Sequence, residues 1–154
     1  MILATLCYLQ HTGQTLMIHR NKRADDIHLG KWNGLGGKFE PGESPEECVL
    51  RELREESGLE VRQPRLCGLL LFTGFKGNDW YVFVFTAREF SGELHENGEG
   101  TLAWIPDSEL EALPLWPSDP IFLPWIREEK FFSAKFIYAG DEMKEYTVTF
   151  HPRS

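Results

Sequence analysis

Residues 37–59, GKFEPGESPEECVLRELREESGL, decide how the middle of the chain folds, because they predict a helix with a clear start and end. Ser44 is a favourable N-cap, and Glu47 completes a capping box with it. Pro45 suits the first helical position, where its missing backbone N–H costs no hydrogen bond. Gly58 can adopt the left-handed conformation that ends many helices. We therefore predict a helix that begins after Ser44 and ends just before Gly58.

Three glutamates share one face of this predicted helix. Glu52, Glu55 and Glu56 stand three and four residues apart, which are the spacings that bring helical side chains together. Arg51 precedes Glu55 by four residues and can hold its carboxylate in place. Neighbouring carboxylates repel one another, and a hard cation such as Mg²⁺ offsets that repulsion. The alternative interpretation is a solvated helix face, which is a common pattern.

A cation on this face favours phosphoryl chemistry. Metal ions neutralise phosphate oxygens and lower the pKa of a bound water, and a glutamate beside that water can remove its proton. Neither a Ser-His-Asp set nor a Cys-His pair stands out in the sequence. A covalent intermediate is therefore not favoured.

The size and charge of the chain limit what it can bind. Its 154 residues, of which 42% are hydrophobic and 26% charged, suit one globular domain over residues 1–154. The formal net charge of −8 argues against general binding to a nucleic-acid polymer, but it allows a small anionic substrate where a cation neutralises the site. No apolar run has the length of a membrane span, and the apolar N-terminus is typical of a strand rather than a signal peptide. We expect a monomeric cytoplasmic enzyme with no membrane partner.

The rest of the chain predicts alternating strands and short helices around a polar loop at residues 21–31. Several neighbouring strands can form hairpins, which favours an α+β or α/β sandwich with a mixed sheet over a purely parallel one. The predicted strands are residues 2–9, 15–20, 66–73, 80–88, 101–105, 131–138 and 145–150. The further predicted helices are residues 107–113 and a segment that reaches Glu129, capped by Asp119 and distorted at Pro124.

Residues 31–38, KWNGLGGK, gather three glycines around an aromatic ring and an amide. Glycine at such a place indicates backbone that comes close to a ligand or to another strand. Both interpretations stay open from the sequence.

The spacing around the acidic helix resembles the complete Nudix box. Gly37 and Glu43 precede Arg51-Glu52-Leu53, Glu55-Glu56 and Gly58-Leu59 at the intervals of that motif, with no departure at a defining position. The resemblance implies a Nudix fold, an α/β/α sandwich with a mixed sheet between helices. It also implies cleavage of a nucleoside diphosphate linked to another moiety, with Mg²⁺ or Mn²⁺ as cofactor.

Roles for individual residues follow from the same resemblance. Arg51 orients a glutamate, and the general base is Glu56 or Glu52, of which we favour Glu56. The implied metal ligands are Glu52, Glu55, Glu56, the Gly36 carbonyl and, from a later loop, Glu99.

The similarity extends beyond the box to MutT-type Nudix enzymes that act on oxidised purine nucleoside triphosphates. Residues 32–38, WNGLGGK, and residues 115–119, LWPSD, carry much of it. By this resemblance Trp116 stacks on the purine, and Asn33 and Asp119 hydrogen-bond its edge. The other implied substrate contacts are Thr5, Arg20, Leu35, Gly36, Gly37, Lys38, Phe72 and Trp80.

One position departs from the related mammalian enzymes, which carry two adjacent acids after Trp-Pro. Here the first of the two is Ser118, which cannot share a proton with Asp119 as a second acid can, so recognition of two kinds of oxidised purine is not implied. Each pocket residue also has a plainer interpretation. Trp116 suits a core, Asp119 a helix cap, Asn33 a turn and Glu99 a solvated loop.

We therefore predict a pyrophosphohydrolase that converts a nucleoside triphosphate and water into a monophosphate and pyrophosphate. An oxidised purine deoxynucleotide such as 8-oxo-dGTP is the expected substrate, as in nucleotide-pool sanitisation. Alternatives are an unmodified dNTP, a methylated purine nucleotide, dihydroneopterin triphosphate, or nucleotide binding without turnover. RNA decapping is disfavoured by the acidic charge and by the absence of a basic stripe.

Overall fold

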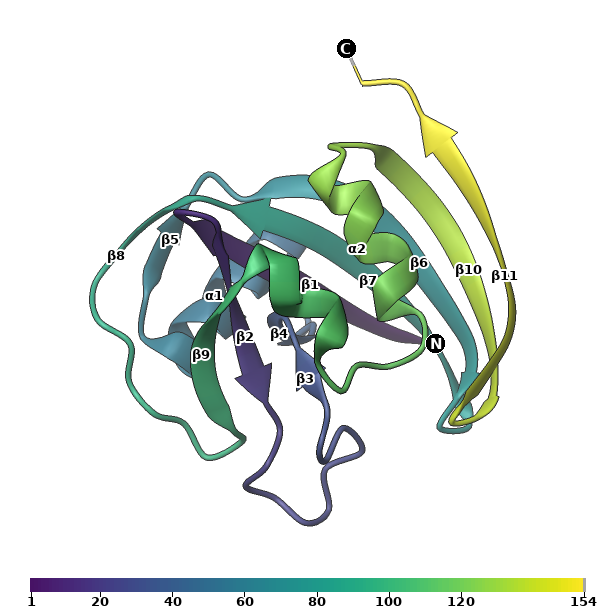
Figure 1. The fold of residues 1–154 in the computed structure, drawn as a ribbon, viewed down its shortest axis with the longest axis horizontal. Coiled ribbons are helices and arrows are strands. Elements are labelled where there is room, and N and C mark those ends of the chain that lie inside the picture. Colours follow the sequence, from purple (N-terminus) through teal and green to yellow (C-terminus); the bar gives the residue numbers. More distant parts are fainter. Residues whose placement is uncertain (154) are drawn as a thin grey trace.

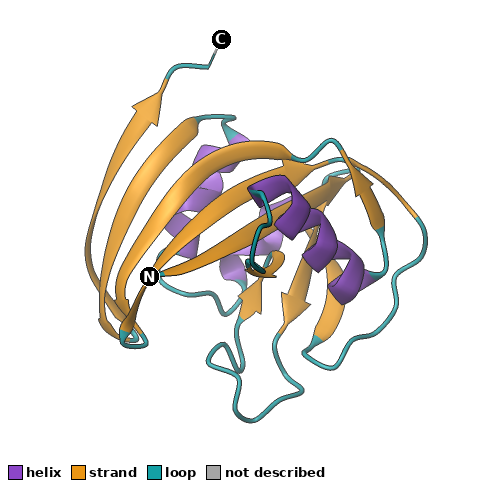
Figure 2. Cartoon of the chain, turned by 180° about the vertical axis from the view of Figure 1, so that it is seen from behind, coloured by secondary structure: helices purple, strands orange, loops and turns teal. Residues whose placement is uncertain are grey.

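A curved mixed sheet with an α-helix on each face forms the framework of the protein (Figure 1, Figure 2). The computed structural model describes residues 1–153. Helix α1 (Pro45–Ser57) lies on one face of the sheet, and helix α2 (Asp119–Arg127) lies on the opposite face. A 3₁₀ helix, η1 (Asp107–Ala112), precedes α2. The predicted sandwich, with its sheet between helices, is therefore confirmed.

The strands supply about half of the described residues. The seven predicted strands are all found, with ends that differ by no more than three residues. The observed strands are β1 (Ile2–His11), β2 (Gln14–His19), β3 (Trp32–Asn33), β4 (Leu35–Lys38), β5 (Glu60–Arg62), β6 (Arg65–Phe75), β7 (Asn78–Ala87), β8 (Glu89–Ser91), β9 (Thr101–Pro106), β10 (Phe131–Gly140) and β11 (Glu142–His151).

The main sheet is mixed, as predicted. Its order is β11-β10-β6-β7-β1-β2-β3, with β4 also paired to β1 and β9 to β2. Strand β1 runs parallel to β7, and β10 runs parallel to β6, whereas the other pairs are antiparallel. Strands β5 and β8 form a separate two-stranded ribbon.

On the edge that faces away from β7, strand β1 divides its pairing between β4 and β2, and this division positions the glycine-rich segment. Residues Ala4–Cys7 pair with β4, whereas only Gln10 and His11 pair with β2. Strand β4 therefore lies beside the first half of β1 and also packs against α1. The glycine-rich segment and the acidic helix, predicted separately, meet at this place.

Each helix covers its own hydrophobic cluster. Val49 and Leu53 of α1 are fully buried against Leu9 and Leu35. Burying a side chain of this size stabilises the fold by roughly 1.5–3 kcal/mol. On the other face, Phe122 of α2 packs into the second cluster, which includes aromatic residues of β10. No helix within residues 1–153 has the length and apolar character needed to cross a membrane.

The predicted start and end of α1 are both confirmed. The backbone N–H of Glu47 donates to Ser44 Oγ, and the Ser44 N–H donates to the Glu47 carboxylate. Gly58 follows the helix with φ of 80°, so its N–H can donate to the carbonyl of Arg54. Local chemistry alone thus decides the bounds of this helix.

The bounds predicted for the last helix are wrong at both ends. The N-cap is Ser118 rather than Asp119, and Ser118 makes no side-chain capping bond. Asp119 is already the first helical residue. The helix ends at Arg127 because Glu129 takes a left-handed backbone conformation with φ of 56°. The helix predicted at residues 107–113 is present as the 3₁₀ helix η1 (Asp107–Ala112). The sequence analysis did not predict the short strands β3, β4, β5 and β8.

Candidate active site

Two glycines of β4 allow close contacts on both sides of this strand. A Cβ atom at Gly36 would overlap the backbone carbonyl of Thr5 on β1. A Cβ atom at Gly37 would lie 2.5 Å from the carboxyl carbon of Glu52 on α1. Gly36 therefore allows β4 to pack closely against β1, and Gly37 allows the Glu52 carboxylate to lie against the backbone of β4. The close approach of another strand is confirmed at Gly36, whereas the approach of a ligand to this segment stays a prediction.

Glu56 is the most unusual of the helix glutamates because it is 4% exposed. Its Oε1 accepts the Gly36 backbone N–H at 2.7 Å, whereas its Oε2 is buried without a hydrogen-bond partner among the described residues. Burial raises the pKa of Glu56 well above its ordinary value, and the charges of Glu52 and Glu99 raise it further. An ionised carboxylate at this position therefore needs a nearby cation.

Arg51 holds the neighbouring acids together. Its Nε and one terminal nitrogen donate to both oxygens of Glu43, at 2.6 and 2.9 Å. The other terminal nitrogen donates to Glu52 at 2.8 Å and to Glu55 at 3.2 Å. These hydrogen bonds lower the pKa of Glu43 to about 2. Sequence reasoning paired Arg51 with Glu55 and missed Glu43, although the spacing of the Nudix box contains that residue.

The acids fit a divalent cation by their chemistry rather than by a preformed cage. No three acidic, histidine or cysteine side chains of residues 1–153 already surround a metal position. The carboxylates of Glu52 and Glu55 instead bind Arg51. The free oxygen of Glu56 and the mutual repulsion of Glu52, Glu56 and Glu99 are the features that a cation would relieve.

Trp116 is enclosed by other side chains and is 6% exposed. Its ring lies edge-on to Phe75, with centroids 4.7 Å apart. The ammonium groups of Lys31 and Lys76 lie over the indole, 5.0 and 5.4 Å from its centroid. The indole N–H donates to Nδ1 of His28 at 2.8 Å, a contact that the sequence analysis did not anticipate.

Asn33 and Asp119 bring polar atoms to the same region. The Trp32 N–H donates to the Pro114 carbonyl, which joins β3 to the loop before α2. Nδ2 of Asn33 is buried without a hydrogen-bond partner in the described part of the chain. Asp119 is 8% exposed, and burial raises its pKa to about 7. One buried amide donor on β3 and one readily protonated acid, whose backbone N–H donates to the Trp116 carbonyl, are therefore available.

The hydroxyl of Ser118 is already occupied. It accepts a hydrogen bond from the Tyr138 hydroxyl at 2.9 Å and donates to Oδ1 of Asp119 at 3.4 Å. The side chain is also fully buried. Asp119 therefore has a hydroxyl rather than a second acid beside it, and that hydroxyl is itself hydrogen-bonded to Tyr138.

Phe72 and Trp80 lie beside Phe75, which contacts Trp116, and they extend this row of aromatic rings toward the acids. We call these four residues the aromatic wall. They are direct partners in the β6–β7 register. Trp80 lies edge-on to Phe75, and the ammonium group of Lys38 lies 5.5 Å from the Trp80 centroid. Lys38 ends β4, so this wall leads from the region of Trp116 to the strand beside α1.

Of the remaining predicted substrate contacts, Leu35 and Thr5 are buried and Arg20 is paired with acids. The side chain of Leu35 is fully buried in the α1 cluster, so only its backbone is available to a ligand. Thr5 is buried, and its hydroxyl lies 3.4 Å from the Gly37 carbonyl. Arg20 donates to Asp26 at 2.7 Å and lies 3.7 Å from Glu99. The Arg20 guanidinium therefore contacts two acids, Asp26 in its own loop and Glu99 in the loop before β9.

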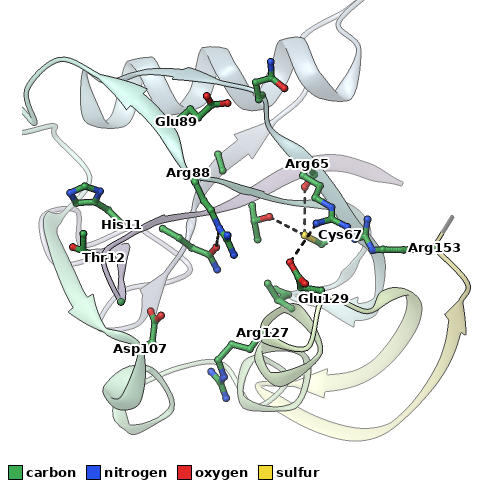
Figure 3. Close-up of a pocket in the computed structure, with 16 residues that line it drawn as sticks. His11, Thr12, Arg65, Cys67, Arg88, Glu89, Asp107, Arg127, Glu129 and Arg153 are labelled. Atoms are coloured by element: carbon green, nitrogen blue, oxygen red, sulfur yellow. Dashed lines mark hydrogen bonds and ion pairs between the residues drawn. The ribbon is translucent and has the colours of Figure 1, made fainter.

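An open groove of about 1070 Å³ lies at the far end of β1, and none of the predicted residues lines it (Figure 3). Arg65, Arg88 and Arg153 project around it, together with Glu129. Arg65 and Glu129 lie 3.6 Å apart. Charges of both signs face this groove, and it shares no residue with the acids of α1.

Comparison with known proteins identifies the family of the chain. The NUDIX domain family matches residues 2–126. The oxidized purine nucleoside triphosphate hydrolase of Mus musculus is 35% identical over 131 residues, which cover 84% of this chain and 82% of that protein. The CTP pyrophosphohydrolase of Escherichia coli (strain K12) is 29% identical over 127 residues, covering 77% and 86% of the two chains. The crystal structure of a MutT protein from Bacillus halodurans superposes with a TM-score of 0.86 at 32% identity, covering 96% of this chain and 97% of that one. The chain therefore belongs to the Nudix family and is a hydrolase.

Proposed function

We propose that this hydrolase converts a nucleoside triphosphate and water into a nucleoside monophosphate and pyrophosphate, with Mg²⁺ or Mn²⁺ as cofactor. The observation that carries the proposal is the hydrogen bonding of the buried Glu56 carboxylate. One carboxylate oxygen is fixed by the Gly36 N–H, and the other is buried and has no hydrogen-bond partner among residues 1–153. A carboxylate oriented in this way, beside two further acids, suits a phosphate anhydride with its associated cation.

The proposed division of labour follows the contacts of each acid. Glu52, Glu55, Glu56, Glu99 and the Gly36 carbonyl would hold the cation. When bound, the cation neutralises phosphate oxygens and lowers the pKa of a water. Oε2 of Glu56 accepts the proton of the attacking water, while Oε1 keeps the carboxylate in place. Arg51 keeps Glu52 directed toward β4 through its hydrogen bond of 2.8 Å.

The proposed substrate is an oxidised purine deoxynucleoside triphosphate such as 8-oxo-dGTP. Trp116, with Phe72 and Trp80, supplies an aromatic surface for a purine, although stacking alone discriminates little among bases. The free amide of Asn33 and the carboxyl of Asp119 would read the purine edge, since leaving them unpaired penalises the wrong base. The similarity to the oxidized purine nucleoside triphosphate hydrolase of Mus musculus supports the same substrate class.

The other implied contacts complete the proposed pose. Lys38, which lies beside Trp80, would meet substrate phosphate. Thr5, Arg20 and the backbone of residues 35–37 would lie near the sugar and the floor of the pocket.

A second candidate is hydrolysis of a different nucleoside triphosphate. The enclosure of Trp116 by Phe75, Lys31 and Lys76 favours it, because a stacked purine requires some of these side chains to move. The similarity to the CTP pyrophosphohydrolase of Escherichia coli supports CTP as one such substrate.

The test is pyrophosphate release with Mg²⁺ across 8-oxo-dGTP, 2-oxo-dATP, dGTP, dATP, CTP and dihydroneopterin triphosphate. We expect 8-oxo-dGTP to lead in kcat/KM by about tenfold or more, equivalent to about 1.4 kcal/mol of transition-state preference. A leading pyrimidine or pterin would replace the proposed substrate but keep the proposed chemistry. If one of these nucleotides binds tightly and none of them is hydrolysed, the protein is instead a nucleotide-binding module.

A further inference from the structure

A side chain from the loop between β2 and β3 reaches Trp116 from 88 positions away in the sequence. Nδ1 of His28 accepts the indole N–H at 2.8 Å, and the two rings are nearly perpendicular, with centroids 5.8 Å apart. A buried indole N–H without an acceptor is costly, so this contact favours one orientation of the ring. His28 is thus the hydrogen-bond partner of the residue proposed to stack on the base.

The imidazole of His28 is held in the form that this contact needs. Nδ1 can accept only in the neutral ring that carries its proton on Nε2. Burial first, and then the charges of Arg20 and Lys76, lower the pKa of His28 to about 4 against the opposing charge of Asp26. The ring also stacks on Phe75, with centroids 6.1 Å apart and planes 23° apart. The acceptor is therefore available at neutral pH and is fixed from a second direction.

The backbone of His28 is tied to the rest of its loop. Its N–H donates to Oδ1 of Asp26 at 2.9 Å, and Oδ2 of Asp26 accepts from Nε of Arg20 at 2.7 Å. The neighbouring residues Ile27 and Leu29 are exposed. His28 is consequently the member of this tripeptide whose side chain turns inward and connects the loop to the aromatic wall.

We propose that His28 is a positioning residue for base recognition, whose Nδ1 fixes the plane of the Trp116 indole and holds the loop at residues 21–31 against the aromatic wall. The proposal rests on the proposed function in one respect, namely that Trp116 stacks on the base. A base stacks well only on a ring whose plane is already set, because ordering the ring on binding would weaken affinity. His28 acts through Trp116 and leaves the acids of α1 unchanged.

Two substitutions separate the acceptor from the bulk of the ring. His28→Phe keeps an aromatic ring on Phe75 but removes the acceptor, whereas His28→Asn keeps an oxygen near the position of Nδ1. His151→Phe is the matched control, since His151 is exposed on β11 and contacts Phe131 and Ser133.

The first readout is the indole N–H resonance of Trp116, assigned by comparison with Trp116→Phe. We expect His28→Phe to shift this resonance upfield and to speed its hydrogen exchange, and His28→Asn to restore it toward the parent. The second readout is steady-state kinetics with 8-oxo-dGTP. His28→Phe should raise KM by about three- to tenfold, as expected for one lost hydrogen bond, with kcat nearly unchanged.

The outcomes separate this proposal from the proposed function. A raised KM in Trp116→Leu together with an unchanged KM and resonance in His28→Phe overturns the role of His28 alone. An unchanged KM in Trp116→Leu overturns the stacking role and the positioning role with it. Equal loss of activity in His28→Phe and His28→Asn, with lowered melting temperature, indicates a merely structural residue and also overturns the proposal.

Discussion

The backbone N–H of Gly36 donates to one carboxylate oxygen of Glu56 at 2.7 Å, and the second oxygen of that carboxylate is buried with no partner in residues 1–153. The glycine therefore fixes the direction of a carboxylate that has one free lone-pair face. This relationship links the two sequence features that drew attention separately, the glycine-rich segment and the acidic helix.

Glu56→Gln tests whether the free oxygen takes a proton. The variant keeps the size of the side chain and its contact with Gly36 but cannot act as a base. We expect kcat to fall by about 10²- to 10⁴-fold, the range for loss of a general base, while nucleotide binding persists. Stopped assays of pyrophosphate release, with calorimetric binding of the substrate, measure both quantities. A kcat within threefold of the parent would remove Glu56 from the role of base.

Arg51→Lys tests the bidentate contact with Glu43. Lysine cannot donate two parallel hydrogen bonds, so Glu43 and Glu52 lose partners in a mostly buried place. We expect the free energy of unfolding to fall by about 1–3 kcal/mol, measured by urea denaturation. Arg54→Lys is the control, because its ion pair with Glu60 is exposed, and it should change stability by less than about 1 kcal/mol. Equal effects would contradict a special role for Arg51.

The pKa of Asp119 predicts how stability depends on pH. Burial raises this pKa from 3.8 to about 7, so the folded protein binds the proton more tightly than the unfolded chain does. The resulting stabilisation is complete below pH 3.8 and is lost as the pH rises toward 7. Asp119→Asn should therefore flatten the fall in unfolding free energy over this window by up to about 1.4 kcal/mol per pH unit.

Urea denaturation between pH 4 and pH 8 measures this effect. Asp25→Asn is the matched control, since the Asp25 side chain is largely exposed and pairs only with Arg23 among the described residues. Parallel curves for Asp119→Asn and the parent would show that Asp119 is ionised throughout the range.

The parts of the fold that the sequence predicted are those decided by neighbouring residues. The bounds of α1 depend on Ser44, Glu47 and Gly58, which act within one turn of the helix ends. The long strands follow from runs of β-forming side chains, which need no knowledge of their partners. Short strands such as β5 (Glu60–Arg62) carry too few residues for such a pattern and exist because β8 pairs with them.

The parts that the sequence analysis missed depend on contacts between distant residues. Aspartate is a residue type that often caps helices, yet here Asp119 is already helical and Ser118 is the N-cap. The Ser118 hydroxyl accepts a hydrogen bond from Tyr138 of β10, a contact that the local sequence does not indicate. The contact of His28 with Trp116 joins two loops, and neither loop has a periodicity that would indicate the other. The motif supplied the candidate acids, whereas only the fold shows that Glu43 is the main partner of Arg51.

The two glycines of β4 predict different consequences for the same substitution. Gly36→Ala places a methyl group against the Thr5 backbone carbonyl, which cannot move without disrupting β1. We expect a loss of about 1–3 kcal/mol in unfolding free energy, as for other overpacked sites. At Gly37 the three atoms nearest to an added Cβ all belong to the carboxylate end of Glu52, a flexible side chain that can turn away. Its stability should change little.

The cost of Gly37→Ala should appear instead in the response to metal. Displacing Glu52 removes one of the proposed ligands, so a higher Mg²⁺ concentration should be needed for half-maximal turnover, with the melting temperature nearly unchanged. Gly98→Ala is the control for both variants, because a Cβ atom there meets nothing within 4 Å. If Gly37→Ala lowers stability as much as Gly36→Ala and leaves the Mg²⁺ dependence unchanged, the close approach of Glu52 to β4 is structural, and the proposed ligand set must exclude that residue.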